Sequence, residues 1–534
     1  MKSRSTENKY QKWFNTGSYR IFSIFFLFSF LLVSNNSIGQ ESIFDQKVKV
    51  VEQKSTVYEV LNQISDQIGY FFIYDSKLVS SDRTVKVSNE SKTLNELLKE
   101  LVDDSSLQFK VIDKHILIYK EDSNKIASQQ SHSSNRVDSL KYLTVKGKVI
   151  DRQSKKPLSF VTVGILEENL GTITNLDGYF SFKLPASFIN SNIVISHLGY
   201  KTQRIPIKIL IDQKIDIFME TEFISIQEVI IRNIDSKELI RKVFQNRQQN
   251  YNGEPVYLTC FYREGVLKDS KYLNYSEAIL KIYKTSYIRN FDSDQIKLLK
   301  SRKIVNVDQK DTVVLKLKGG LHSCLALDII KNIPDFMDPE TFDSYNFTKV
   351  DIVSINSRNA YAIAFEQKEF VTEPLYKGTL YVDMDSYALI SSNFEINPKY
   401  VKNTDYLFIL KKSKKFRVTP EKISYSVTYN YLNGRYYISH IRGDLTINYK
   451  KRYHVFSNSF NAFLELAASQ IDTLNVQKFE REEVLKTNTV FLDTKFTFDE
   501  TYWGDYNIIV PEEKLSQALS RINAKMELVK SDQP

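Results

Sequence analysis

The strongest constraint on this chain is a repeat with an offset of 37 residues near the N-terminus. Five positions of the first copy recur in the second as identical or similar residues: Val48, Thr56, Glu59, Leu61 and Ile64 become Val85, Thr93, Glu96, Leu98 and Leu101. In each copy a Thr-x-x-Glu sequence predicts a capping box ahead of an apolar helical stripe, and Gly69 ends the first helix. Short alternating runs flank both helices. Two such halves can cover each other's apolar faces, which predicts a small split βαβ sandwich.

By this doubled motif, residues 43–120 resemble the short N-terminal domain of secretins and TonB-dependent receptors. The resemblance implies a docking module without catalytic residues, whose partner is a periplasmic or membrane protein such as an anti-sigma regulator or a TonB-system component. A ferredoxin-like domain of unrelated role is the alternative that the same pattern allows.

The segment ahead of the repeat predicts an exported protein. A basic region precedes the apolar run Ile21–Val33, whose 13 residues are too few for a comfortable membrane span. Ser37-Ile38-Gly39 then offers small residues for cleavage before Gln40, so we expect a signal peptide over residues 1–39. This places the chain in the periplasm of a Gram-negative envelope, associated with the outer membrane. An uncleaved signal that anchors it in the inner membrane is the alternative.

A polar, Ser-rich stretch at 121–141 predicts a flexible linker, and a β-sandwich follows it. Leu143–Ile150 and Phe160–Val163 both alternate as strands around a turn at 155–158. Gly171–Phe180 and His197–Thr202 are similar to the carboxypeptidase-regulatory-like domain, a transthyretin-like seven-stranded fold, over residues 142–222. That domain is an accessory sandwich of some peptidases and is distinct from their zinc catalytic domain.

One loop of this sandwich raises the question of a metal. Asn175 and Asp177 have the spacing of calcium-binding oxygens. We interpret them instead as turn residues whose side chains bond the backbone, with Gly178 at a positive φ. His197 likewise is interpreted as a residue beside a turn and not as a ligand.

In TonB-dependent transporters of the polysaccharide-uptake type, these two modules precede a plug and a large barrel. Glu228–Ile231 is similar to the segment before the plug, but Asp235-Ser236-Lys237-Glu238 predicts a capping box for a helix through Asn250. Residues 223–250 are therefore expected to be a connector helix. Fewer than 300 residues follow, which is too few for a plug and a 22-stranded barrel.

Residues 251–534 predict a large antiparallel β-meander with flanking helices. The alternating runs are Tyr257–Arg263, Tyr275–Tyr283, Ala360–Glu366, Gly378–Asp383, Ala388–Ile396, Ile423–Leu432, Arg435–Ile441 and Gly443–Lys450. Asn433-Gly434 predicts a type I′ hairpin. A small outer-membrane barrel is an alternative, but the polar amphipathic helix expected from Pro511 to Leu528 argues against it.

Two further resemblances fall in this region. Tyr376–Asp383 with Ser386–Leu389 is similar to a strand-turn-strand of periplasmic lipoprotein carriers, whose curved sheet holds an acyl chain. Phe261–Glu264 and Trp503–Ile509 resemble recurrent signatures of uncharacterised envelope proteins that carry the regulatory-like sandwich. In the curved sheet, one face must be filled by a ligand or by the C-terminal helix.

The sequence offers little catalytic chemistry. The zinc carboxypeptidase, HExxH and Walker A patterns are all missing. His322-Ser323-Cys324 has no partner that sequence can identify, and His440 with His454 would be a two-His site. Lys411–Lys415 reads as a solvated loop that could also meet anionic lipid headgroups. We therefore predict no catalytic, cofactor-binding or metal-binding residues. Cys260 and Cys324 are either a disulfide or two buried thiols.

Charge adds one exclusion. The formal net charge is +9, but residues 1–39 hold five bases and one acid, so the remaining chain carries about +5. This charge is too diffuse for a nucleic-acid partner.

The fold class predicted is multi-domain α+β: the βαβ repeat, the sandwich and the β-rich domain at 251–534. The function predicted is a non-catalytic envelope adaptor or signalling protein. A lipid or glycolipid carrier is the first alternative, and an envelope hydrolase is the second.

Overall fold

The computed structural model describes residues 42–50, 54–74, 78–80, 82–87, 90–102, 104–112, 114–120, 142–165, 168–211, 213–222, 235–268, 271–288, 292–305, 315–317, 320–355, 358–412, 416–451, 457–486, 502–513 and 515–517. The predicted signal peptide, the linker at 121–141, Glu228–Ile231, His454 and the C-terminal helix beyond residue 517 lie outside these residues. The chain divides into two compact units, residues 1–69 with 80–105 and residues 70–79 with 106–534.

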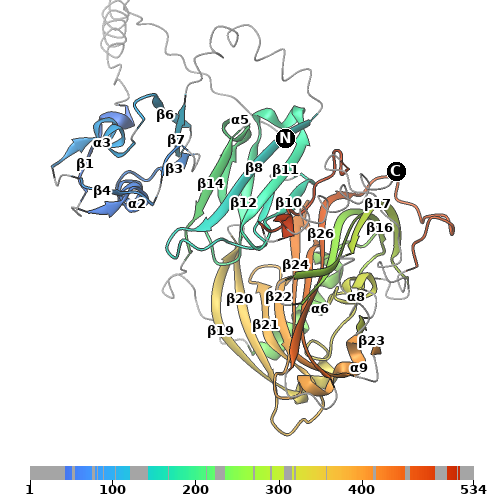
Figure 1. Cartoon of the computed structure of the whole chain (residues 1–534). Coiled ribbons are helices and arrows are strands. Elements are labelled where there is room, and N and C mark those ends of the chain that lie inside the picture. Colours follow the sequence, from blue (N-terminus) through green and yellow to red (C-terminus); the bar gives the residue numbers. More distant parts are fainter. Residues whose placement is uncertain are drawn as a thin grey trace, which may run out of the picture. The chain divides into compact units, whose positions relative to one another are not determined.

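The first unit contains the two helices of the repeat (Figure 1). Its elements are η1 (Ile43–Asp45), β1 (Lys47–Val48), β2 (Ser55–Thr56), α2 (Val57–Ile68), β4 (Thr84–Val85), β5 (Lys92–Thr93) and α3 (Leu94–Leu101). Both capping boxes are confirmed, at Thr56 with Glu59 and at Thr93 with Glu96. Gly69 ends α2 with a φ of 71°, as predicted.

The repeat also governs strand pairing in this unit. The offset of 37 residues relates β1 to β4 and β2 to β5, but the pairs formed are β1 with β5 and β2 with β4. Each copy therefore pairs its first strand with the second strand of the other copy. This reciprocal exchange follows from the similarity of the copies, because each offers the same backbone edge to the other.

The second unit begins with a small three-stranded sheet. Its order is β3 (Phe71–Tyr74), β7 (His115–Lys120) and β6 (Leu107–Ile112), with β3 parallel and β6 antiparallel to β7.

A β-sandwich follows in the same unit. One sheet has the order β10 (Gly171–Ile173), β9 (Thr162–Ile165), β12 (Asn192–Ser196) and β13 (Gln203–Pro206). The other has the order β11 (Tyr179–Pro185), β8 (Tyr142–Asp151) and β14 (Lys214–Met219), while η2 (Ala186–Asn190) and α5 (Ile207–Leu210) lie between strands in the sequence. Inward residues such as Val145, Phe182 and Ile195 form the core between them. The four and three strands make seven, the number that the resemblance implies.

The sequence placed Phe160 in a strand, and this is wrong. Phe160 precedes β9 with a φ of 59°, which is uncommon for a bulky residue. Its backbone amide donates to the carbonyl of Thr174 at 3.1 Å, and this contact holds it in the turn.

The largest element is an antiparallel sheet of ten strands (Figure 1). Its order is β17 (Gln295–Val305), β16 (Lys271–Lys284), β15 (Val256–Lys268), β26 (Asn458–Asp472), β25 (Arg435–Lys451), β24 (Phe416–Leu432), β22 (Leu389–Ile396), β21 (Tyr376–Asp383), β20 (Arg358–Gln367) and β19 (Tyr345–Ile355). The eight predicted runs fall in seven of these strands, apart from Ala388, which precedes β22, and Arg435–Ile441 and Gly443–Lys450 belong to the single strand β25. The strands β17, β19 and β26 were not predicted. The hairpin at Asn433-Gly434 is confirmed, with φ of 48° and 82°.

The sheet is a meander with one exception. Each strand pairs with its neighbour in the chain, but β26 pairs with both β25 and β15. The last strand thus joins the β15–β17 hairpins to the strands from β19 onward. A separate pair is formed by β18 (Leu315–Leu317) and β23 (Ile409–Lys412).

One face of the sheet is covered by the chain's own helical segments. The helical elements are α6 (Ser236–Gln245), α7 (Arg247–Asn250), α8 (Gly320–Ala326), η3 (Pro339–Ser344), η4 (Val401–Asn403) and α9 (Asp405–Phe408). Leu239 and Ile240 of α6, Leu321 of α8 and the loop residues Phe336 and Met337 are all buried in one core with the sheet. The sequence suggested a ligand or the C-terminal helix as the filler of one face; these segments fill this face, and most of the predicted C-terminal helix lies outside the described residues.

The predicted helix after Asp235 exists and reaches Asn250 as expected, but it is interrupted at Asn246. Asp235 accepts a hydrogen bond from the amide of Lys237, and α6 ends at Gln245 before the short α7. In the part of the chain that the structure describes, helices are short, and none has the length and apolarity that crossing a membrane requires.

Candidate functional site

The face of the sheet opposite α6 and α8 carries a groove of about 610 Å³. Successive side chains of a strand alternate between faces, so Phe365 and Phe394 enter the core while their neighbours point outward. Two ladders of outward residues cross six adjacent strands, β19 to β25. They are Asn346, Glu366, Lys377, Glu395, Ser424 and Asp444, and beside them Thr348, Ala364, Thr379, Asn393, Ser426 and Arg442.

This groove is polar and nearly neutral. Its charged side chains are three acids and two bases, and they alternate along the ladders. Lys377 Nζ lies 3.3 Å from Glu395 Oε1, and Arg442 binds Asp444 through two bonds of 2.7 and 2.8 Å. At about 4.8 Å per strand, the five spacings give a length of roughly 24 Å. Such a surface suits an extended, polar and uncharged or zwitterionic occupant.

Phe160 of the sandwich closes one end of the groove. Its ring centroid lies 4.8 Å from that of His440, and the guanidinium of Arg442 lies 5.3 Å from the same ring. A residue held at this φ costs on the order of 1–3 kcal/mol, which the surrounding contacts must offset. The strained backbone of Phe160 therefore lies where the sandwich, the sheet and the groove meet.

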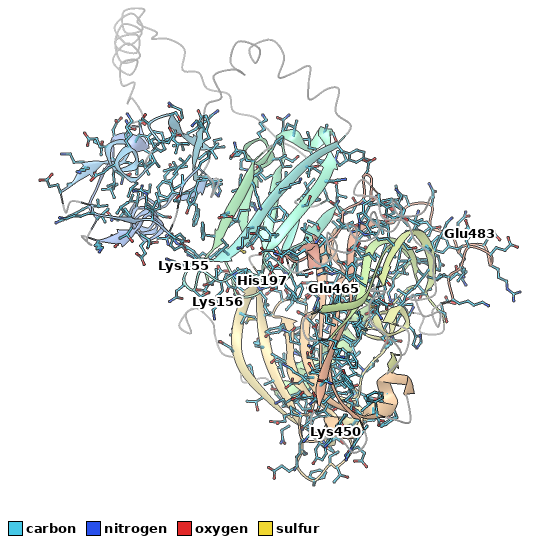
Figure 2. The ribbon with its side chains drawn as sticks, in the orientation of Figure 1. Lys155, Lys156, His197, Lys450, Glu465 and Glu483 are labelled. Carbon is cyan, nitrogen blue, oxygen red and sulfur yellow. The ribbon has the colours of Figure 1, made fainter. Side chains whose placement is uncertain are left out.

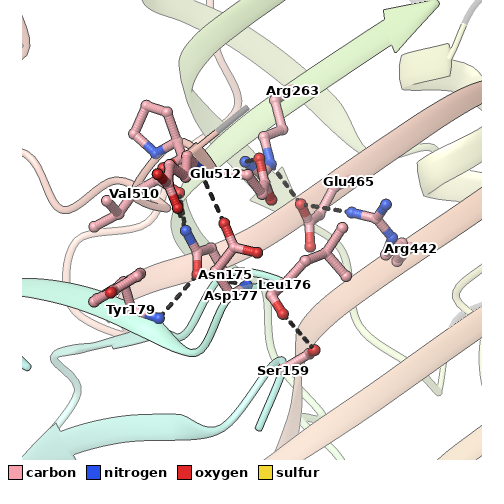
Figure 3. Close-up of polar contacts among 12 residues, drawn as sticks. Ser159, Asn175, Leu176, Asp177, Tyr179, Arg263, Arg442, Glu465, Val510 and Glu512 are labelled. Atoms are coloured by element: carbon pink, nitrogen blue, oxygen red, sulfur yellow. Dashed lines mark hydrogen bonds and ion pairs between the residues drawn. The ribbon is translucent and has the colours of Figure 1, made fainter. Parts of the chain in front are cut away.

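Behind this end lies a buried ion network (Figure 3). Arg263 of β15 has a fully buried side chain, and its Nε lies 2.5 Å from Oε2 of Glu465 on the neighbouring strand β26. Its Nη1 and Nη2 donate to Glu512 at 3.0 and 2.7 Å. The guanidinium is therefore shared between the sheet and the C-terminal segment.

Glu465 is the centre of the network and lies inside the molecule (Figure 2). Arg442 approaches the Oε2 of Glu465 at 3.2 Å, and Nε2 of His440 lies 2.9 Å from its Oε1. Burial alone would raise the pKa of Glu465, but Arg263 and Arg442 hold that pKa well below its usual range. Glu465 is therefore ionised, and its oxygens are committed to three partners of the protein.

The sandwich reaches the same place through one loop (Figure 3). Asn175 Oδ1 accepts from the amides of Asp177 at 3.0 Å and Tyr179 at 2.9 Å, while its Nδ2 donates to the carbonyl of Val510 at 3.0 Å. Asp177 Oδ2 accepts from the amide of Glu513 at 2.9 Å. The turn interpretation is confirmed, and the oxygens that resembled calcium ligands bind backbone amides instead.

Gly178 completes this turn. It has a φ of 78°, as predicted, and an added Cβ would lie 2.5 Å from the carbonyl oxygen of Val149. A side chain here would therefore meet both backbone strain and a collision.

The two sequence signatures meet at this junction. Phe261 and Trp503 make an edge-to-face contact with centroids 5.7 Å apart, and Arg263 binds Glu512 close by. Asn507 Oδ1 accepts from the amide of Lys183 at 2.7 Å, and its Nδ2 donates to the same residue's carbonyl at 2.9 Å. The C-terminal segment 502–513 thus binds the sandwich and the sheet at once.

A second buried network lies on the sheet's helix-covered side and was missed from the sequence. Lys284 Nζ lies 2.7 Å from Asp294 and 2.6 Å from Asp328, and the hydroxyls of Tyr287 and Tyr429 donate to Asp328 at 2.7 and 2.8 Å. Burial acts to raise the pKa of Asp294, but Lys284 and a second lysine lower it to about 2. Lys284 is one of several charged residues of β16, so the sequence held no signal that singled it out.

The other residues singled out from the sequence do not converge. His322 and Cys324 lie on α8, where Cys324 faces the core, and His440 is part of the Glu465 network. Cys260 and Cys324 are both free and buried, so the disulfide alternative is wrong. Among the described residues, no three His, Cys, Asp or Glu side chains gather as metal ligands.

His197 lies in the turn after β12 (Figure 2). In this turn the amide of Gly199 donates to the carbonyl of Ser354 on β19 at 2.7 Å. Burial lowers the pKa of His197 to about 4. Of the run Lys411–Lys415, the first two residues lie in β23 and the others lie outside the described residues.

Residues 145–231 match the family model of the CarboxypepD_reg-like domain. This match supports the regulatory-like part of the sequence prediction and covers the sandwich. The resemblance of residues 43–120 to the short N-terminal domain stays a prediction. The chain has no match among curated proteins.

Several solved structures resemble part of the chain at low similarity. A candidate outer membrane lipoprotein-sorting protein domain from Vibrio parahaemolyticus has 8% identity and a TM-score of 0.20, and the match covers 46% of this chain and 95% of that domain. A LolA superfamily protein from Nitrosomonas europaea has 11% identity and a TM-score of 0.19, with 47% and 98% covered. MucB in complex with MucA(peri) has 13% identity and a TM-score of 0.17, with 44% and 98% covered. At these scores the similarities support no argument about function.

Proposed function

We propose that this chain is a non-catalytic cell-envelope adaptor. In this proposal the sandwich and the ten-stranded sheet form a scaffold, and residues 43–120 dock a periplasmic or membrane protein. The polar groove on the sheet is a second contact surface, for an extended and nearly neutral segment or ligand.

The observation that carries the proposal is the buried junction of sandwich, sheet and C-terminal segment. Arg263, Glu465 and Glu512 come from three distant parts of the chain, and the guanidinium of Arg263 forms ion pairs with both carboxylates. The loop at Asn175 and Asp177 fastens the sandwich to the same segment. Ion pairs of this kind support a structural joint between parts of a scaffold. In this proposal these three side chains hold the joint together and do not act as an acid or base.

The covered face of the sheet weighs against the lipid-carrier alternative. A carrier of the kind that the sequence resembles holds its acyl chain against the curved sheet. Here Leu239, Ile240, Leu321, Phe336 and Met337 of the same chain occupy that face and are almost completely buried.

The test is site-specific photocrosslinking with the full chain in envelopes of the source cells. A crosslinking residue replaces exposed Lys99 on α3, exposed Asn393 in the groove, or Phe370, which is 74% exposed and does not line the groove. The proposal expects one defined protein adduct from the Lys99 position and none from the Phe370 position. An adduct at Asn393 would identify the molecule that binds in the groove.

Two results would overturn the proposal. One is the absence of any adduct specific to the Lys99 position. The other is a stoichiometric lipid that organic solvent extracts from the purified chain, because a carrier must hold its cargo through purification.

A further inference from the structure

A second cavity, of about 630 Å³, lies between the sandwich and the ten-stranded sheet. We infer that it binds a small amphipathic anion, a carboxylate or phosphate monoester with an apolar body. Its volume falls within the range of about 300–1,000 Å³ that is usual for small-molecule sites, which often lie between folded parts of a chain. The inference is independent of the adaptor proposal, since this cavity shares neither the groove nor residues 43–120.

The sandwich wall of the cavity is built from the outward positions of three paired strands. Gly164, Val194 and Arg204 lie opposite one another across β9, β12 and β13, and Gly164 also pairs with Gly171 of β10. The two glycines send no side chain into this space. The centre of the cavity is therefore open because these two positions are glycine, and Arg204 lies at its edge.

Beside this row runs a second row, of hydroxyls. Thr162 pairs with Ser196, and both line the cavity together with Thr202. The Oγ1 of Thr202 is buried and has no hydrogen-bond partner in the part of the chain that the structure describes. A buried hydroxyl without a partner costs free energy, so rotation of this side chain toward a ligand oxygen in the cavity would satisfy it.

The charges of the lining favour an anion. Arg204 makes no ion pair with any described residue. Arg358 also lines the cavity, and its Nε and Nη2 bind Asp383 at 2.7 and 3.0 Å, which fixes the guanidinium, while its Nη1 bonds no other described residue. The exposed Glu168 is the one acid among the lining residues. Arginine presents planar donors that match carboxylate and phosphate oxygens.

The sheet side of the cavity supplies the apolar surface. Tyr431 is 47% exposed, and the Arg358 guanidinium lies 4.9 Å from its ring centroid. Ile390, Tyr436 and Ile471 add apolar surface around it. A ligand with its acid group at Arg204 and Thr202 would therefore place its apolar body against these side chains.

Calorimetric titration of the purified full chain tests this site with octanoate, octyl phosphate and the uncharged analogue octanol. We expect one site per chain for at least one of the two anions and at least tenfold weaker binding of octanol. A preference between octanoate and octyl phosphate assigns the acid group. Equal binding of octanol would overturn the requirement for an anion.

Three variants locate the ligand. Arg204→Ala should weaken binding at least tenfold, and Val194→Phe should abolish it by filling the cavity. Lys208→Ala, which removes an exposed cation of the same sandwich outside the lining, should bind as the original chain does. Thermal melting without ligand shows that each variant is folded. Unchanged binding in both cavity variants, or binding to neither anion, would refute the site.

Discussion

Replacement of Arg263 by methionine tests the junction most directly. Methionine keeps most of the apolar stem but removes the guanidinium that binds Glu465 at 2.5 Å and Glu512 at 2.7 Å. Removing one partner of a buried ion pair typically costs 3–5 kcal/mol, because the other charge stays buried. Glu465 keeps Arg442 and His440, so we expect a loss near the lower end, about 3 kcal/mol.

The chain supplies its own reporter for this measurement. It has two tryptophans, and one of them, Trp13, lies in the predicted signal peptide. In a protein that begins at Gln40, fluorescence excited at the red edge of the absorption band, where tyrosine does not absorb, therefore reports only Trp503, which packs on Phe261 at the junction. Urea unfolding followed by this fluorescence gives the change in the free energy of unfolding, measured at the junction that the substitution alters.

The pH dependence of the loss follows from Glu465. A carboxylate whose pKa is lowered in the folded state stabilises the protein above its unfolded pKa and loses this contribution as the pH falls through the folded pKa. Without Arg263, the folded pKa of Glu465 rises. The variant's deficit should therefore be full at pH 7 and shrink as the pH falls into the ordinary glutamate range, near about 4.3.

The matched control is Arg241→Met, which breaks an exposed pair with Glu238 on α6. Exposed pairs contribute about 0–1 kcal/mol, so this loss should be small. The double variant Arg263→Met with Glu465→Gln should lose less than the sum of its single variants, since the two side chains interact directly. A loss for Arg263→Met no larger than that for Arg241→Met would refute the reasoning.

Three further predictions concern turns, ionisation and thiols. Gly178→Ala should destabilise the chain more than Gly199→Ala, because both glycines have positive φ but only Gly178 has a carbonyl within 2.5 Å of the added Cβ; equal melting temperatures would contradict this. Asp294→Asn should cost about 2 kcal/mol at pH 7 and progressively less below pH 4, as the carboxylate's contribution vanishes toward its folded pKa of about 2; urea unfolding at several pH values checks the trend. Burial raises the pKa of Cys260 to about 12 and holds that of Cys324 well above its usual range, so a thiol reagent at pH 8 should label neither until urea unfolds the chain, and labelling of the native protein would show that they are accessible.

The groove and the second cavity give the scaffold two faces of different chemistry. The groove is lined by alternating charges and hydroxyls, and the cavity combines the exposed Arg204, which forms no ion pair with a described residue, with apolar rings. Phe160 lies at the groove, whereas Arg204 lies at the cavity, so the same sandwich contributes to both. Ligand binding at one place and partner contact at the other can therefore be measured separately with the variants described above.

Many helix caps, strands and turns of this fold could be predicted from the sequence, because they depend on residues that are close together in the chain. The capping boxes at Thr56 and Thr93 need only residues within one helical turn, and Asn433-Gly434 needs only its own φ values. Alternation placed the strands because period two is a property of the extended chain. The turn at Gly178 was likewise predicted from its immediate neighbours.

The sequence did not reveal which distant residues meet. Arg263 is 202 residues from Glu465 and 249 from Glu512, and each was an ordinary charged residue when viewed alone. The available signal was a charged residue within each of two largely apolar strands, Arg263 in β15 and Glu465 in β26, whereas Glu512 lies outside the strands. It could suggest buried ion pairs but could not choose the partners.

The sequence by itself predicted the two helices of the repeat, the helix after Asp235, seven of the ten strands of the large sheet, the turns and the regulatory-like sandwich, because backbone geometry within a few residues sets these features. Tertiary structure decided that β26 lies beside β15, that α6 and α8 cover the sheet, and that the C-terminal segment joins sandwich to sheet. The physical reason is that antiparallel strands can pair in many orders at similar local cost. Only burial of the whole apolar surface, with every buried charge paired, selects among these orders.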